Sequence, residues 1–274
     1  MGGKNIREFG FVIGKSKSLK KPYLFSDGII QAIIKAKEYE YSTIEPHLRD
    51  PKEVNTNEVL KYSKKYNIKI SGISTGLSFN IDKLSLISDL PEIKNSAIKR
   101  LKEYIDLANI IGGFIIIGTM RGNIPYESEY EFYLEKLSES MKTLTEYAIN
   151  KNVALLLEAA NRYESNYLNR VEEVFNFITN YKIQNLKILM DTFHMNIEEK
   201  DMNKSIRKYG KLLGYFHISD SNRMYPGAGH INFREIVKSL NSINYNGYII
   251  LECFPLPSGK IAANKALTFI RSIM

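Results

Sequence analysis

The chain has 274 residues, of which 44% are hydrophobic, and a formal net charge of +8. The apolar fraction is ordinary for a globular protein, and the one cysteine, Cys253, excludes an intrachain disulfide framework and a cysteine-based zinc site. No apolar run approaches the ~20 residues that a membrane span needs, and the amino-terminal residues contain no apolar core of a signal peptide. We therefore expect a cytoplasmic globular protein.

The positive charge has two interpretations. It is typical of proteins that bind an acidic partner, such as a nucleic acid, a membrane surface or a phosphorylated substrate. It also arises when lysines are spread over solvated helix faces. The lysines of this chain are dispersed, apart from a cluster at Lys15, Lys17, Lys20 and Lys21. We favour the second interpretation and expect no nucleic-acid partner and no membrane partner.

Along the chain, eight short apolar segments alternate with eight amphipathic ones. The apolar segments are rich in Ile, Val, Leu and Phe, as parallel strands buried on both faces are. They cover residues 9–13, 41–45, 68–74, 113–118, 153–158, 186–191, 213–219 and 247–252. The amphipathic segments predict helices over 29–40, 57–66 with a possible cap at Thr56, 95–111, 129–150, 167–180, 203–209, 232–243 and 259–273.

This alternation predicts a parallel sheet with right-handed crossovers. Eight such units in 274 residues favour a closed (β/α)8 TIM barrel over an open sheet. No linker or low-complexity segment interrupts the pattern, so we expect one domain over residues 1–274. The longer connections follow the strands, on the face where barrel enzymes carry their active sites.

Four consecutive predicted strands end in a residue that can bind a metal ion. These residues are spaced by 33, 26 and 35 positions, and they are Glu158, Asp191, His217 and Glu252. A carboxylate or imidazole at the end of a buried strand is costly unless something pairs with it, so we expect the four side chains to converge. Three carboxylates and one imidazole suit Mn²⁺, Mg²⁺ or Co²⁺. The alternative for Asp191 alone, which Thr192 follows, is that it caps a helix.

The second half of the chain resembles the tagatose/psicose 3-epimerase family, within the xylose-isomerase-like sugar isomerases and epimerases. The resemblance rests on LLLEAANRYESNYLN, MDTFHMNIEEKD, GYFHISDSNRMYPGAGHINF and ILECFP, and it is strong from about residue 95 onward. It implies a xylose-isomerase-like barrel that epimerises a ketose with a divalent metal ion, Mn²⁺ foremost.

The resemblance also implies a role for each matching residue. The metal ligands are Glu158, Asp191, His217 and Glu252, and the paired acid and base carboxylates are Glu158 and Glu252. The residues that orient the O1/O2 end of the ketose are Glu164, His194 and Arg223. Plainer interpretations exist: Glu164 can pair with Arg162 in a loop, and His194 and Arg223 can be ordinary polar residues.

The first half of the chain departs from the family pattern. Arg121 lies in the loop after the fourth predicted strand, and the lysine cluster lies in the loop after the first. Both loops belong to the catalytic face, so Arg121 is a candidate substrate-binding residue for a phosphorylated ketose. The alternative, which we favour, is ordinary solvated charge.

Other functions fit the same barrel. An aldose–ketose isomerase or a ketose-phosphate epimerase uses the same metal scaffold. An apurinic-site endonuclease needs a three-zinc cluster with several histidines, and this chain has four histidines, of which we expect two at strand ends of the site. A sugar-binding protein without turnover is a further alternative. We expect a sugar or sugar phosphate as the small-molecule partner, and a homodimer or homotetramer.

Overall fold

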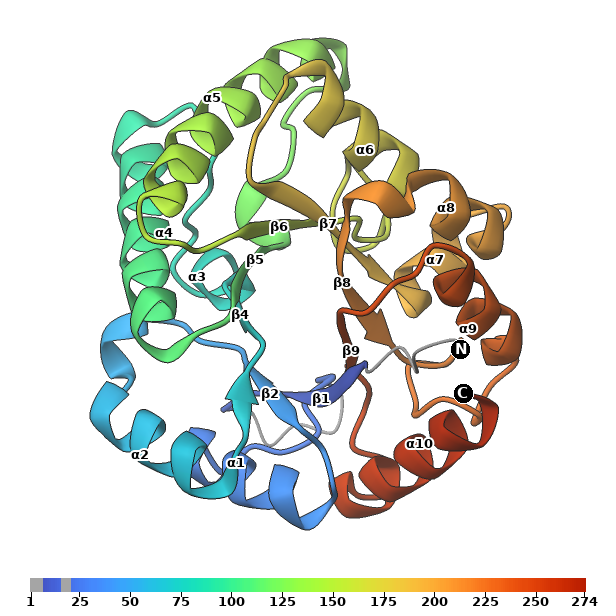
Figure 1. Ribbon diagram of the computed structural model, residues 1–274. Helices are drawn as coiled ribbons and strands as arrows, with labels where there is room; N and C mark the ends of the chain where they lie inside the picture. The colour runs from blue at the N-terminus through green and yellow to red at the C-terminus, as the bar shows by residue number, and fades with distance from the viewer. Residues whose placement is uncertain (1–6, 16–20) are drawn as a thin grey trace.

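The computed structural model describes residues 7–15 and 21–274. In this part of the chain, parallel strands form a ring in the order β3-β2-β1-β9-β8-β7-β6-β5-β4 (Figure 1). The predicted TIM barrel is confirmed. The strands are β1 (Glu8–Ile13), β2 (Thr43–Pro46), β3 (Lys69–Ile70), β4 (Gly72–Ser74), β5 (Phe114–Ile117), β6 (Leu155–Glu158), β7 (Leu186–Asp191), β8 (Leu213–Ile218) and β9 (Tyr248–Leu251).

The third predicted strand is divided in two at Ser71. Its first half, β3, pairs with β2, and its second half, β4, pairs with β5. Ser71 contacts both neighbours, because its N–H donates to Ile44 O at 3.1 Å and its carbonyl accepts from Phe114 N at 3.0 Å. A parallel bridge between His47 and Ser74 continues the pairing of the second and third barrel strands beyond β2. Because β3 and β4 are two halves of one barrel strand, the nine segments form eight barrel strands.

Helices surround the ring of strands on its outside (Figure 1). Those that follow the strands are α1 (Ile29–Glu38), α2 (Thr56–Tyr66), α4 (Pro91–Ile111), α5 (Tyr130–Ile149), α6 (Val171–Asn180), α8 (Met202–Tyr209), α9 (Phe233–Ser242) and α10 (Gly259–Ile273). Two short helices, α3 (Gly76–Asn80) and α7 (Thr192–Glu198), follow β4 and β7 directly. None of the described helices is both long and apolar enough to cross a membrane.

Helix ends differ from the prediction where local chemistry decides them. Asn55, not Thr56, caps α2, because its side chain accepts a hydrogen bond from Glu58 N. Helix α4 begins earlier than predicted, at Pro91, since proline suits the first position of a helix. Helix α6 begins four residues later than predicted, at Val171, after Leu168 adopts a left-handed backbone with φ 52°.

The interior of the barrel holds an apolar cluster that borders the site, because two of its members, Tyr23 and Ile116, also line the cavity of the site. It contains Val12, Tyr23, Ile116, Leu156, Leu189, Tyr215 and Ile250. Successive side chains of a strand point to opposite faces, so the residue two positions after an interior residue also points inward. In four strands that residue is polar: Glu158, Asp191, His217 and Glu252 follow Leu156, Leu189, Tyr215 and Ile250. The strand period therefore carries all four side chains into the barrel above its core.

Candidate metal centre and active site

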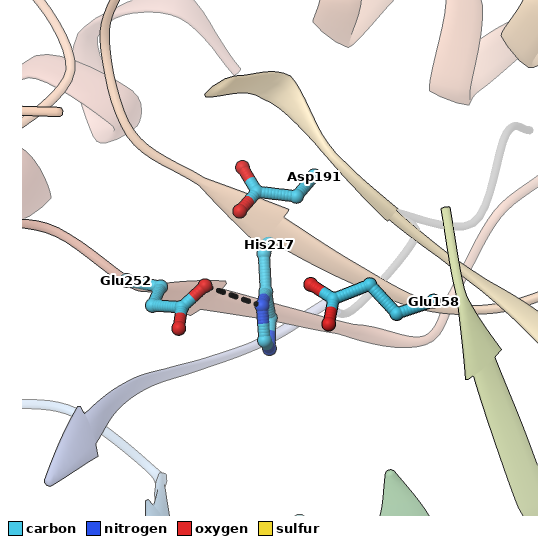
Figure 2. Close-up of side chains that lie close together, drawn as sticks. All are labelled: Glu158, Asp191, His217 and Glu252. Atoms are coloured by element: carbon cyan, nitrogen blue, oxygen red, sulfur yellow. Dashed lines mark hydrogen bonds and ion pairs between the residues drawn. The ribbon is translucent and has the colours of Figure 1, made fainter. Parts of the chain in front are cut away.

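The four predicted metal ligands converge in the structure. Each of Glu158, Asp191, His217 and Glu252 offers one ligand atom, and these atoms lie within 4.8 Å of one another. They come from the carboxyl ends of β6, β7, β8 and β9. Figure 2 shows the carboxylates of Glu158 and Glu252 on opposite sides of the His217 ring, with Asp191 above it. Asp191 also caps α7, since its Oδ1 accepts from Phe193 N at 2.8 Å, and its Oδ2 remains available to the group.

The ring of His217 lies between two carboxylates. Its Nδ1 is 3.0 Å from Glu252 Oε2, and its Nε2 is 2.8 Å from Oε2 of Glu45, a buried residue of β2. Burial disfavours the charged imidazolium, but Glu45 and Glu252 outweigh it and hold the pKa of His217 well above its ordinary value. Glu45 therefore orients the ring so that Nδ1 faces the ligand group.

Arg223 supplies the positive charge beside the group. Its guanidinium donates to Asp191 Oδ2 at 2.5 Å and to Glu252 Oε2 at 2.7 Å. Burial lowers its pKa, but the two carboxylates raise it above the usual value, so the guanidinium stays charged. The backbone of Arg223 is left-handed, with φ 60°, and is held by hydrogen bonds from Arg223 N to Asp220 O and from Phe254 N to Arg223 O.

His194 stands beside Glu158 and is fixed by Asn161. The Oδ1 atom of Asn161 accepts from Tyr163 N at 2.9 Å, so the amide nitrogen of Asn161 donates to His194 Nδ1 at 2.6 Å. His194 Nε2 then carries a proton and faces Glu158 Oε1 at 3.5 Å and Asp191 Oδ2 at 3.7 Å. Both carboxylates raise the pKa of His194 against the opposing effect of burial.

A cavity of about 580 Å³ opens above these side chains. Three of the predicted substrate residues, Glu164, His194 and Arg223, line it together with Glu158 and Glu252. Glu164 is not paired with Arg162 in the described structure, because Arg162 binds Glu198 through both nitrogens of its fork. The volume is in the range of pockets that hold small organic ligands.

Arg121 does not lie in this cavity, and both interpretations of it, as a substrate-binding residue and as ordinary solvated charge, are corrected. The side chain is 0% exposed. Its guanidinium donates to the carbonyl oxygens of Glu158, Tyr167 and Leu168 and lies over the Tyr167 ring at 5.4 Å. The hydrogen bonds of this buried side chain therefore link the end of β6 to the loop that follows it. The sequence alone could not distinguish a substrate-binding arginine from a buried one, because an arginine after a strand can occupy either position.

The predicted lysine loop is only partly described. Lys17 and Lys20 lie outside the described residues. Lys15 forms an exposed ion pair with Glu53, which is not a phosphate site. Lys21 is exposed and lines the mouth of the cavity, so it is the one described member of the cluster that contacts the candidate site.

Two residues of the site were missed by sequence reasoning. Glu45 ends the second predicted strand and is fully buried, and His47 follows two residues later and lines the cavity. Our expectation of two histidines at the site is therefore corrected to three. The signal was present, because Glu45 stands at a strand end as Glu158 and Asp191 do.

The donor set fits a divalent cation. Three carboxylates and one imidazole form the group, and a fourth carboxylate, Glu45, lies behind it, whereas Arg223 is the one arginine in contact with it among the described residues. Without a cation, this excess of negative charge raises the pKa of His217, so that a proton on that ring offsets part of it. Oxygen-rich sites with one imidazole suit Mn²⁺, Mg²⁺ and Co²⁺.

Residues 33–273 match the family described as "Xylose isomerase-like TIM barrel". The chain belongs to this family. It is 32% identical to the L-ribulose 3-epimerase of Methylomonas sp. strain DH-1 over 230 residues. The matched region covers 83% of this chain and 79% of the relative. It is 27% identical to the ketose 3-epimerase of Arthrobacter globiformis, over 84% of this chain and 78% of the relative. Epimerases are isomerases, so this family member is an enzyme of the isomerase class.

Solved structures agree with this. A D-allulose 3-epimerase from Methylomonas sp. in complex with D-allulose is 26% identical, with a TM-score of 0.84 over 98% of both chains. A family 2 AP endonuclease from Brucella melitensis has a TM-score of 0.79 at 14% identity, over 96% of this chain and 99% of that one, which shows the shared fold alone. The expected resemblance to the ketose 3-epimerases is confirmed.

Proposed function

We propose that this protein is a divalent-metal-dependent ketose 3-epimerase. The observation that carries the proposal is that Glu158 and Glu252, two members of the ligand group, lie on opposite sides of the His217 ring (Figure 2). Inversion of a carbon through a planar enediolate needs one group that removes a proton from one face and another that returns a proton to the other face. Relatives named L-ribulose 3-epimerase, D-psicose 3-epimerase and ketose 3-epimerase support this reaction.

Each side chain has a distinct task in this proposal. Glu158 and Glu252 move the proton at C3, one on each face of the sugar. His194, Glu164 and Arg223 hold the O1/O2 end of the ketose, and Asn161 fixes the tautomer of His194 through its hydrogen bond to Nδ1. A divalent cation, when bound, stabilises the negative charge that develops on the two adjacent oxygens.

Manganese is the cation that we propose. The oligomeric state, a homodimer or a homotetramer, stays a prediction. The free ketose is favoured over a ketose phosphate, because Arg121 is bound to main-chain carbonyls inside the protein. The apurinic-site endonuclease is disfavoured, since the described residues bring one group of ligands together and not three zinc sites.

The test is a panel of ketoses, ketose phosphates and aldoses, each incubated with metal-stripped protein before and after Mn²⁺ is added. Product NMR separates the outcomes. A ketose epimeric at C3, formed only after the metal is added, supports the proposal. An aldose product identifies an aldose–ketose isomerase, and turnover of phosphates alone identifies a ketose-phosphate epimerase.

A further inference from the structure

His47 lines the cavity two residues after Glu45, at the end of β2. His194 lines the same cavity from the end of β7, which is four strands from β2 in the ring. Its backbone extends the second barrel strand beyond Pro46, because His47 N donates to Ile13 O at 2.8 Å and a bridge joins His47 to Ser74. The alternation of strand side chains points Glu45 and His47 to the same side, into the barrel. The imidazole lines the cavity and packs edge-on against the Tyr23 ring, with 4.9 Å between the centroids.

The Nε2 atom of His47 is buried and lacks a hydrogen bond within the described residues. It lies 3.5 Å from Glu45 Oε1 and 3.7 Å from Glu252 Oε1, and both distances exceed those of ordinary N–H···O bonds. Glu45 Oε1 already accepts from Ser74 Oγ at 2.7 Å. A buried ring nitrogen without a partner is costly, so its position suits a group that enters the cavity.

The two proton-transfer carboxylates have matching surroundings. Oε1 of Glu158 lies 3.5 Å from Nε2 of His194, and Oε1 of Glu252 lies 3.7 Å from Nε2 of His47. The other oxygen of Glu252 is occupied, because it contacts His217 and Arg223. A sugar oxygen that approaches Oε1 of Glu252 therefore also meets His47.

We infer that His47 determines substrate specificity by hydrogen bonding to the hydroxyl on C4, next to the carbon that is epimerised. This rests on the proposed function, which places O1 and O2 at Arg223 and His194. A ketose held by that end extends across the cavity toward the opposite wall. There the segment that extends β2 contributes His47, and the oxygen after the reacting carbon is the one that comes within reach of its Nε2.

The test compares wild type with His47→Phe and His47→Asn, as full-length protein loaded with Mn²⁺. Phenylalanine keeps a ring against Tyr23 but cannot form the hydrogen bond, whereas asparagine keeps a polar amide. The substrates are D-fructose and D-tagatose, which differ only at C4, and 4-deoxy-D-fructose. For each combination of protein and sugar we measure kcat/KM and sugar affinity. For each protein we also measure Mn²⁺ affinity and the unfolding temperature.

We expect wild type to distinguish the two C4 epimers. His47→Phe should lower kcat/KM for the preferred epimer about tenfold, in line with one lost hydrogen bond, and should abolish the distinction. The 4-deoxy sugar should react equally with wild type and His47→Phe, Mn²⁺ affinity should not change, and His47→Asn should restore part of the distinction.

Two results overturn the inference. One is an equal loss on both epimers and on the 4-deoxy sugar, which assigns His47 a structural role. The other is a loss of Mn²⁺ affinity in His47→Phe, which assigns it to the metal site. If wild type binds the sugars but converts none, the proposed function fails by itself, and the same comparison of sugar affinities still decides the role of His47.

Discussion

Oε2 of Glu45 lies 2.8 Å from Nε2 of His217, so a buried carboxylate of the second barrel strand orients an imidazole of the proposed metal centre. The contact joins residues 172 positions apart and involves the ring nitrogen that faces away from Glu252. Partners of this kind fix the tautomer of a metal-binding histidine and raise its basicity.

Removal of the Glu45 carboxylate should weaken metal binding. We expect Glu45→Gln to reduce Mn²⁺ affinity by about 10–100-fold, because outer partners of metal ligands contribute effects of that size. Titration calorimetry on the metal-free protein measures this. Ser74→Ala is the matched control, since it deletes only the hydrogen bond to Oε1 of Glu45 and leaves the contact with His217. Equal affinities for wild type and Glu45→Gln contradict the assignment.

Metal binding should release a proton. Glu45 and Glu252 overcome the effect of burial and raise the pKa of His217 well above its ordinary value, so a proton on Nδ1 competes with a cation in the metal-free protein. A cation that binds Nδ1 displaces that proton, and affinity should therefore fall as pH falls, by up to about tenfold per pH unit for one proton. The buried carboxylate of Asp191 adds nothing in this range, because Arg223 and the histidines lower its pKa despite burial. Calorimetry in two buffers of different ionisation enthalpy counts the protons, and a count of zero disproves the expectation.

Replacement of either proton-transfer carboxylate should stop epimerisation. We expect Glu158→Gln and Glu252→Gln each to lose about 10²–10⁴-fold in turnover, as for other general acids and bases. Each variant retains one carboxylate, so in D₂O it should still exchange the C3 proton of the one epimer that faces this group. Exchange without inversion is visible by NMR. Near-wild-type epimerisation by either variant rules out the two-carboxylate mechanism.

Much of this site follows from the sequence, because the strand period places Glu158, Asp191 and Glu252 above apolar interior residues. Arg121 is different. Burial of an arginine against carbonyl oxygens depends on the path of the loop after β6, which has no periodicity to indicate it. The left-handed turn at Leu168 and the division of the third strand at Ser71 are likewise set by tertiary contacts.

Arg121 should matter for stability. In Arg121→Met, the carbonyl oxygens of Glu158 and Tyr167 lose a buried donor, and each loss costs about 1–3 kcal/mol in the free energy of unfolding. Urea denaturation measures the change. Arg162→Met is the control, because it removes an arginine from the loop after β6, which Arg121 contacts, and the side chain of Arg162 is 61% exposed. We therefore expect a much smaller effect. Equal unfolding free energies for the two variants contradict the buried role.

The most direct test of the two-carboxylate epimerisation is the position of deuterium after turnover in D₂O. The wild-type protein with Mn²⁺ is incubated with the ketose that it converts, and the product is examined by NMR. We predict one deuterium at C3 of the epimeric ketose and none at C1. Deuterium at C1, or an aldose as the product, contradicts the assignment of Glu158 and Glu252 to the two faces of C3.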